Sequence, residues 1–170
     1  MLNLNNKTDF FFDCLPSYDS GYLEVGNGHS IYFEQYGNPE GIPIMFLHGG
    51  PGAGFSNSHK IFFDPNIFRV IFFDQRGSGK SIPYAETYYN NTQLLISDIE
   101  DLRKSLKIDK WYLFGGSWGS TLALLYGIEF PNRCMGFILR GIFLGTKIEI
   151  NWFLYDLSLI HIWRCRRPIP

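Results

Sequence analysis

The sequence predicts an α/β fold with a mostly parallel sheet, helices on both faces of the sheet and an N-terminal β-hairpin. Three observations lead to this prediction. From residue 42 onward, short apolar runs alternate with helix-like segments, which is the rhythm of a parallel sheet. Residues 21–37 hold two strand-like runs around Gly26-Asn27-Gly28, and Asn and Gly accept the positive φ angles of hairpin turns. A chain of 170 residues has the size of one ordinary domain.

Four short apolar runs are predicted to be buried strands of this sheet. A continuous apolar run is expected of a strand whose two faces are both covered. The runs are IPIMFL (42–47), RVIFFD (69–74), WYLFG (111–115) and MGFILRG (135–141). Glycine-bearing loops follow the first three, at 48–54, 75–81 and 115–119. Ligands of open α/β sheets bind beyond the carboxyl ends of the strands, so these loops mark the predicted functional region.

Two segments between these strands are predicted to be helices. Residues 92–107 place apolar side chains four, three and four positions apart, which lines one helix face, and Thr92 can cap the start. The apolar residues of that face are Leu95, Ile99, Leu102 and Leu106. Residues 120–130 form the second predicted helix, which Pro131 ends because proline cannot continue a helix.

Composition and charge argue against several classes of protein. With 15 basic and 16 acidic side chains the net charge is -1, which does not favour a nucleic-acid or membrane-surface partner. No apolar run is long enough to span a bilayer, and residues 1–25 lack the pattern of a secretory signal. The three cysteines, Cys14, Cys134 and Cys165, form no CxxC pair, so neither a disulfide framework nor a zinc site is expected. A cytoplasmic protein is the resulting expectation.

The segment FGGSWGS (114–120) fits the G-x-S-x-G pattern of a nucleophile elbow. In such an elbow, glycines such as Gly115 and Gly119 let a strand and a helix approach closely around a strained turn, which exposes the serine hydroxyl. A predicted strand precedes Ser117 and a predicted helix follows it, as the motif requires. We therefore interpret Ser117 as a nucleophile; the alternative is a plain tight turn. Ser120 is expected to lie within the helix and to serve packing.

The loop HGGPG (48–52) is suited to supply hydrogen-bond donors to a developing oxyanion. An oxyanion hole needs two donors that are already aimed. One would be the backbone N–H of Trp118, and the other should come from the loop after an earlier strand. The alternative is a bare glycine-rich connection; a phosphate-binding loop fits less well, because the Lys and Ser/Thr are lacking. His48 is expected to orient this loop rather than act as a base, while His29 and His59 are expected at the surface.

The segment FFDQRGSGKS (72–81) places Asp74, Gln75 and Arg76 at the end of the next strand. We interpret it as a loop that braces the site. The alternative is an Asp–Arg surface turn, since a charge pair by itself shows little.

Together these motifs resemble the proline iminopeptidase (prolyl aminopeptidase) family of α/β-hydrolases. The matching pieces are FLHGGPGAG, VIFFDQRGSGKS, FGGSWGSTLALLYGIEFP and CMGFILRGIFLG, and the resemblance runs from about residue 10 to about residue 156. It implies a serine aminopeptidase that releases N-terminal proline from peptides, without a cofactor. It also implies that Ser117 is the nucleophile, that Gly50 and Trp118 supply the oxyanion hole, and that Gly49 belongs to the supporting loop.

The sequence departs from this family after Ser117. In the α/β-hydrolase fold the triad follows the chain order Ser, then Asp or Glu, then His. The resemblance places that acid and base on later strands, beyond a helical cap, and neither the strands nor the cap is found here. The acids and the histidine after Ser117 are Glu129, Glu149, Asp156 and His161. Asp156 and His161 lie five positions apart with no strand between them, so they are not expected to complete a triad.

The tail LSLIHIWRCRRPIP (157–170) looks foreign to a hydrolase because Arg, Cys and Pro crowd together there. We expect residues 1–156 to be the N-terminal part of a hydrolase domain and the chain to be a fragment of a longer enzyme, inactive alone. Such a fragment is expected to expose an apolar face where further strands would pack. Another α/β-hydrolase activity, such as an esterase or a different peptidase, and a non-catalytic binding module remain alternatives. The oligomeric state is not predicted.

Overall fold

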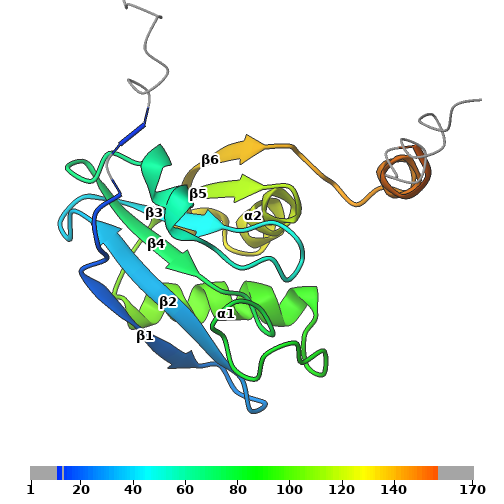
Figure 1. Ribbon diagram of the computed structural model, residues 1–170, viewed down its shortest axis with the longest axis horizontal. Helices are drawn as coiled ribbons and strands as arrows, with labels where there is room; N and C mark the ends of the chain where they lie inside the picture. Colours follow the sequence, from blue (N-terminus) through cyan, green and yellow to red (C-terminus); the bar gives the residue numbers. More distant parts are fainter. Residues whose placement is uncertain (1–10, 13, 157–170) are drawn as a thin grey trace, which may run out of the picture.

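The computed structural model describes residues 11, 12 and 14–156 (Figure 1). His161, Cys165 and the tail 157–170, which the sequence analysis singled out, lie outside the described residues. The strands are β1 (Asp19–Glu24), β2 (Ser30–Gly37), β3 (Ile42–Leu47), β4 (Phe68–Phe73), β5 (Trp111–Gly116) and β6 (Cys134–Arg140). The helices are η1 (Asn57–Phe62), α1 (Thr92–Ser105), α2 (Trp118–Glu129), η2 (Pro131–Arg133), α3 (Lys147–Asn151) and η3 (Trp152–Asp156).

The six strands form one sheet in the order β1-β2-β4-β3-β5-β6. β4, β3, β5 and β6 run parallel to one another, while β1 and β2 form an antiparallel hairpin whose second strand pairs with β4. Asn27 and both flanking glycines of the hairpin turn have positive φ angles, as that turn requires. The predicted α/β fold with a mostly parallel sheet and an N-terminal hairpin is confirmed.

Both long helices cover the same face of the sheet (Figure 1). Leu95, Ile99 and Leu102 of α1 and Leu122 and Tyr126 of α2 belong to one buried cluster with that face of the sheet. The second face is covered by the short 3₁₀ helix η1 and its flanks. A smaller, mostly aromatic cluster forms there, made of Tyr36, Ile44, Phe46, Phe63, Val70 and Phe72. Helices were predicted on both faces. The two long helices cover one face, and among the described residues the other face is covered by the short 3₁₀ helix η1.

The boundaries of the helices follow local capping and backbone geometry. Asn91, rather than Thr92, caps α1, because its side chain accepts a hydrogen bond from the Leu94 N–H at 3.0 Å. α2 begins at Trp118, two residues before the predicted start, because the chain turns sharply at Ser117 and becomes helical at once. No helix in the described part of the chain is long and apolar enough to cross a membrane.

β6 differs from its prediction as a buried strand. It lies at the end of the strand order, so among the described strands only β5 pairs with it. Met135, Phe137 and Ile138 are each more than 40% exposed. A continuous apolar run therefore identified a strand correctly but not its burial, because burial depends on what packs beside the strand. The expected exposed apolar surface is found along this edge.

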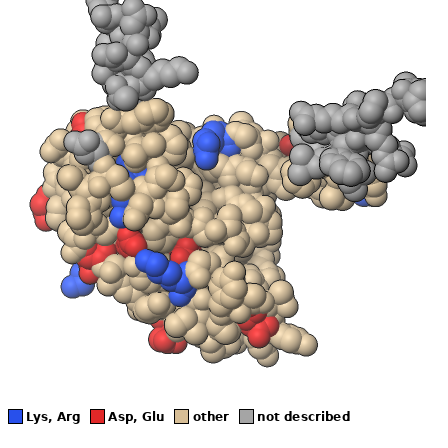
Figure 2. Space-filling model, viewed as in Figure 1, with Lys and Arg blue, Asp and Glu red and all other residues tan. Residues whose placement is uncertain are grey.

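Charged side chains are distributed unevenly over the face in Figure 2. Lys, Arg, Asp and Glu intermix on the side of the hairpin β1–β2, and the surface toward β6 carries few of them. At the hairpin side, the Glu34 carboxylate is buried and accepts hydrogen bonds from the Ser17 hydroxyl at 2.6 Å and the Tyr32 hydroxyl at 2.9 Å. The Lys60 ammonium lies 3.1 Å from it. Burial alone would raise the pKa of Glu34, but these donors outweigh burial and lower the pKa to about 2.

Glu34 is expected to make the stability of the fold depend on pH. Its folded-state pKa lies below the unfolded value, so its contribution is present above about pH 4.5 and is lost as the pH falls toward about 2. At pH 7, Glu34→Gln should lower the free energy of unfolding by about 2 kcal/mol, because Lys60 is left buried without its anion. Urea unfolding of both proteins at pH 7 and pH 3 should show this difference shrinking at the lower pH. A difference of equal size at both values would contradict the assignment.

Candidate active site

Ser117 lies on a strained bend between β5 and α2. Its φ and ψ angles are 54° and -123°, a conformation that residues other than glycine adopt rarely, and its side chain is exposed. Its two motif glycines have no room for a side chain. A Cβ atom at Gly119 would overlap the carbonyl oxygen of Leu47 at the end of β3, and one at Gly115 would overlap the carbonyl oxygen of Gly119. The motif therefore brings β3, β5 and α2 into direct contact around an exposed hydroxyl.

The glycine-rich loop after β3 lies directly beside this bend. A Cβ atom added to Gly49 would be 3.4 Å from the Ser117 Cβ. Gly50 follows with a φ angle of 120°, which suits glycine, and is exposed. Trp118 is the first residue of α2, so its backbone N–H has no acceptor within the helix. The structure thus brings the predicted nucleophile together with the loop and the amide that were predicted to face it.

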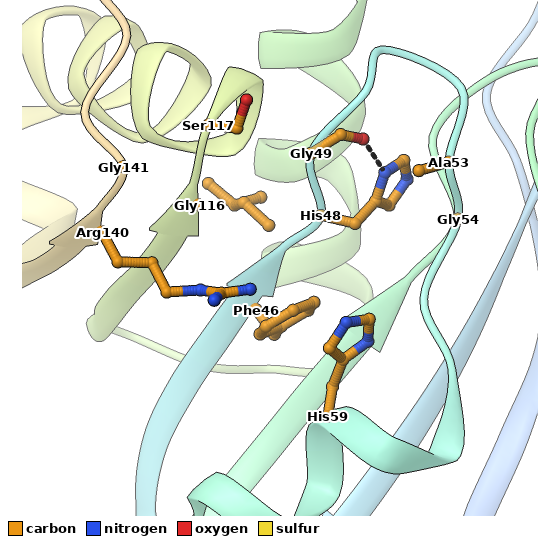
Figure 3. Close-up of a pocket in the computed structure, with 11 residues that line it drawn as sticks. Phe46, His48, Gly49, Ala53, Gly54, His59, Gly116, Ser117, Arg140 and Gly141 are labelled. Carbon is orange, nitrogen blue, oxygen red and sulfur yellow. Dashed lines mark hydrogen bonds between the residues drawn. The ribbon is translucent and has the colours of Figure 1, made fainter. Parts of the chain in front are cut away.

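A cavity of about 300 Å³ lies beside Ser117 and Gly49 (Figure 3), and neither Gly50 nor Trp118 is among the residues that line it. Ser117 and Gly49 lie at one end of it, and the Arg140 and His59 side chains lie at the other. The remaining lining residues are Phe46, Leu47, His48, Ala53, Gly54, Gly116 and Gly141. Its size suits a small substrate group next to the hydroxyl.

His48 is buried, and both of its ring nitrogens are engaged. Its Nε2 accepts a hydrogen bond from the Gln75 backbone N–H at 3.0 Å, so its Nδ1 carries the proton and donates to the Gly49 carbonyl at 2.8 Å (Figure 3). Burial lowers the pKa of His48, which keeps the ring neutral. A ring held in this way can orient the loop but has no free nitrogen with which to take a proton from Ser117.

Asp74 joins the loop after β3 to the loop after β4. Its carboxylate accepts backbone N–H groups of Phe55 at 2.9 Å and Lys80 at 2.8 Å. Gly54 and Gly79 pack against it, and a Cβ atom at Gly79 would overlap the carboxylate. Asp74 therefore holds the two loops in a fixed relation.

Gln75 connects the loop after β3 to the start of α2. Its side-chain nitrogen donates to the His48 carbonyl at 3.0 Å, and its side-chain oxygen accepts the Trp118 indole N–H at 3.0 Å. Only 2% of the residue is exposed. One amide group thus links the residues on either side of the predicted oxyanion site.

Arg76 does not pair with Asp74, and neither residue lies on the surface. The Arg76 guanidinium forms a bidentate ion pair with Asp98 of α1, at 2.7 and 2.8 Å, and both side chains are 1% exposed. It also donates to the carbonyl oxygens of Tyr89 at 3.0 Å and Val25 at 2.8 Å. The alternative of an Asp–Arg surface turn is therefore wrong.

The segment after β6 is attached to the bend by hydrogen bonds that the sequence analysis missed. The Ser117 N–H donates to the Arg140 carbonyl at 3.1 Å. The Ser120 hydroxyl donates to the Ser117 carbonyl at 2.6 Å and accepts the Phe143 N–H at 3.0 Å. Ser120 thus connects the nucleophile's backbone to this segment, beyond the packing role expected of it. The second serine of GGSWGS was the available signal, because a buried hydroxyl needs a partner.

Two histidines expected at the surface lie elsewhere. His29 is 2% exposed, and its Nε2 lies 3.0 Å from the Tyr88 carbonyl. His59 is partly buried at the cavity, where its ring packs on Phe46 with the ring centroids 4.7 Å apart. Burial and the nearby Arg140 cation lower the pKa of His59, so its ring is neutral near pH 7.

No acid or base completes a triad around Ser117 within residues 14–156. The Ser117 hydroxyl has no hydrogen bond there to a histidine or a carboxylate. Glu129 is the last residue of α2 and lies about 16 Å along the helix axis from Trp118, the first residue of that helix. The Glu149 carboxylate accepts the N–H groups of Leu144 at 3.1 Å and Thr146 at 3.0 Å. Among the described residues, no three His, Cys, Asp or Glu side chains cluster in a way that could hold a metal ion.

Comparison with known proteins agrees with this geometry. The family described as alpha/beta hydrolase fold matches residues 42–164. The chain belongs to the α/β-hydrolase fold family. Within it, the chain is 54% identical over 145 residues to a probable proline iminopeptidase of Leptolyngbya boryana, covering 85% of this chain and 45% of that protein. It is 53% identical over 141 residues to the proline iminopeptidase of Neisseria gonorrhoeae, covering 83% of this chain and 46% of that protein.

Solved structures share the same fold. A proline iminopeptidase-related protein from Thermus thermophilus superposes with a TM-score of 0.61 at 32% identity, covering 71% of this chain and 43% of that chain. An epoxide hydrolase of Vigna radiata superposes with a TM-score of 0.67 at 22% identity, covering 88% of this chain and 48% of that chain, which shows the fold alone. The chain spans less than half the length of each of these four relatives.

Proposed function

We propose that this chain carries the nucleophile and the oxyanion site of a serine aminopeptidase that releases N-terminal proline from peptides. The observation that carries the proposal is the strained, exposed Ser117 beside the Gly49 loop, in a chain 54% identical to a probable proline iminopeptidase. A side chain held at a positive φ angle is costly, and such strain concentrates at functional sites.

In the proposed reaction, the Ser117 Oγ attacks the carbonyl carbon of the N-terminal proline. The Oγ–C bond forms, the hydroxyl proton passes to a general base, and the negative charge moves to the carbonyl oxygen. The backbone N–H groups of Trp118 and Gly50 are proposed to donate to that oxygen. His48, Gly49, Asp74, Gln75, Arg76, Gly115 and Gly119 are proposed to hold this geometry without touching the reacting atoms.

The general base is the part of the reaction that the described residues do not supply. A serine hydroxyl without an adjacent base is a weak nucleophile at neutral pH. The oxyanion donors alone retain only a residual rate enhancement, about 10³–10⁴ over water in serine proteases without their triad. We therefore expect the chain by itself to release no measurable proline, and a base and an acid supplied with it to restore the reaction.

A chimera tests the proposed function. The 141 residues that match the Neisseria gonorrhoeae relative would replace the corresponding part of that protein, which then supplies the remaining half. The chimera is expected to hydrolyse proline 2-naphthylamide but not its N-acetylated form, because the family's names imply a free N-terminal proline. Ser117→Ala should lower kcat by about 10⁴-fold or more, whereas Ser97→Ala, at an exposed position of α1, should not change it.

Two results would overturn the proposal. The first is a folded chimera that leaves proline 2-naphthylamide intact, and the second is hydrolysis that persists in Ser117→Ala. Cleavage of p-nitrophenyl butyrate without cleavage of the prolyl substrate would instead favour an esterase of the same fold. Binding of a prolyl peptide without any turnover would favour a non-catalytic module.

A further inference from the structure

We infer that Gln75 is a positioning residue that sets the spacing of the two oxyanion amides. The inference rests on the proposed function, because it assumes that the N–H groups of Gly50 and Trp118 face one oxygen. It goes beyond a general bracing role for the loop at 75–81, since it assigns the task to one side-chain amide in one orientation.

Gln75 joins the loop after β3 to the start of α2. Its backbone N–H donates to His48 Nε2 and its side-chain nitrogen donates to the His48 carbonyl, both at 3.0 Å. His48 directly precedes Gly49 and Gly50, so these two bonds fix the start of the glycine loop. The side-chain oxygen of Gln75 accepts a hydrogen bond from the Trp118 indole N–H, and this bond fixes the first residue of α2. The two amides of the proposed oxyanion site are thus joined through one side chain.

The hydrogen-bond pattern fixes which way the amide of Gln75 faces. Rotating the group by half a turn would place its NH₂ against the Trp118 indole N–H and its oxygen against the His48 carbonyl. Donor would then face donor and acceptor would face acceptor, in a place where only 2% of the residue is exposed to water. Glutamate cannot replace this group, because its carboxylate has no proton to donate to the carbonyl. Only an amide satisfies both neighbours at once.

Because Gln75 is buried, the hydrogen bonds of its side-chain amide affect the spacing of the Gly50 and Trp118 N–H groups. Losing the amide removes a buried bond to the His48 carbonyl and a partly buried bond to the Trp118 indole N–H, so the carbonyl is left without a partner that water can replace. The loop and the helix would then relax apart. Oxyanion stabilisation requires both donors within about 3.1 Å of the oxygen, and removal of one donor costs about 10²–10³ in rate. A shift of one loop therefore lowers the reactivity of Ser117 without removing any reacting group.

The test measures the reactivity of Ser117 in the full chain. An alkyl fluorophosphonate at pH 9 forms a bond between the serine Oγ and phosphorus, fluoride leaves, and hydroxide takes the proton. Mass spectrometry gives the labelling rate of Ser117 relative to Ser97, an exposed serine of α1 in the same molecule. Wild-type chain should label Ser117 at least about 100-fold faster than Ser97, since oxyanion donors act even without a base. Gln75→Met should lower this ratio by about 10- to 100-fold.

Gln35→Met is the matched control. Gln35 is also buried, at 5% exposure, and also uses its amide to join separate segments, donating to Asp19 at 2.6 Å and accepting from Arg69 at 2.9 Å. It lies on β2, away from the cavity. Its replacement should cost stability but leave the Ser117 to Ser97 ratio within about twofold of wild type. Trp118→Phe keeps the backbone N–H and an aromatic ring but removes the indole bond, so it tests the same link if Gln75→Met fails to fold.

The outcomes separate the two proposals. A wild-type ratio near one would overturn both, because Ser117 would then behave as an ordinary surface serine. A high wild-type ratio that Gln75→Met and Trp118→Phe leave unchanged would overturn the role of Gln75 alone. An equal decrease in Gln35→Met would also overturn it, since general destabilisation would then explain the loss.

Discussion

Gly119→Ala is expected to lower the free energy of unfolding by about 3 kcal/mol and to disturb the bend at Ser117. The new methyl group would overlap the Leu47 carbonyl oxygen and lie 2.9 Å from the His48 carbonyl oxygen. Both atoms belong to backbone, which cannot move aside as a flexible side chain can, so β3 and α2 must separate. Overpacking of this kind costs about 1–3 kcal/mol and occasionally more. Urea unfolding followed by circular dichroism measures the change.

Gly21→Ala provides the comparison for this substitution. Gly21 lies in β1, and a Cβ atom there would meet only the Phe33 ring at 3.5 Å, which is ordinary van der Waals contact. The substitution should change the free energy of unfolding by less than about 0.5 kcal/mol. If both alanine variants lost the same stability, the close approach of α2 to β3 would not be the cause.

Arg76→Met is expected to destabilise the fold by about 3–5 kcal/mol. The substitution leaves the Asp98 carboxylate buried without its cation, and breaking a buried pair from one side typically costs this much. It also removes the donors to the carbonyl oxygens of Tyr89 and Val25. Because Arg76 ties the loop after β4 to α1 and to the hairpin, the unfolding midpoint should fall sharply. The same urea unfolding experiment measures it.

Arg133→Met tests whether burial is the cause. Arg133 lies 2.6 Å from Asp109, as close as Arg76 lies to Asp98, but the side chains are 40% and 78% exposed. Exposed pairs contribute about 0–1 kcal/mol, so this variant should be nearly neutral. A loss below about 1 kcal/mol in Arg76→Met, or equal losses in both variants, would show that the buried pair does not anchor the loop.

The local parts of the fold could be predicted because they depend on neighbouring residues. The hairpin turn at Asn27 and the strand over 42–47 follow from turn chemistry and apolar runs. The bend at Ser117 follows from glycines whose places next to other backbone only glycine can occupy. Each of these patterns lies within a few residues.

The parts that could not be predicted depend on distant partners. Arg76 pairs with Asp98, 22 positions away, and no spacing rule in the sequence connects them. The exposure of β6 depends on which strands lie beside it, and an apolar run is the same whether or not it is covered. The place of His59 at the cavity depends on η1 folding over Phe46 of β3. Such contacts are set by tertiary packing, which local pattern does not report.

The oxyanion site at Ser117 is tested most directly by a crystal structure of the chain after fluorophosphonate labelling. We predict a single adduct on Ser117, with the phosphonyl oxygen within about 3.1 Å of the backbone nitrogens of Trp118 and Gly50. An adduct whose phosphonyl oxygen points into solvent, away from both nitrogens, would contradict it.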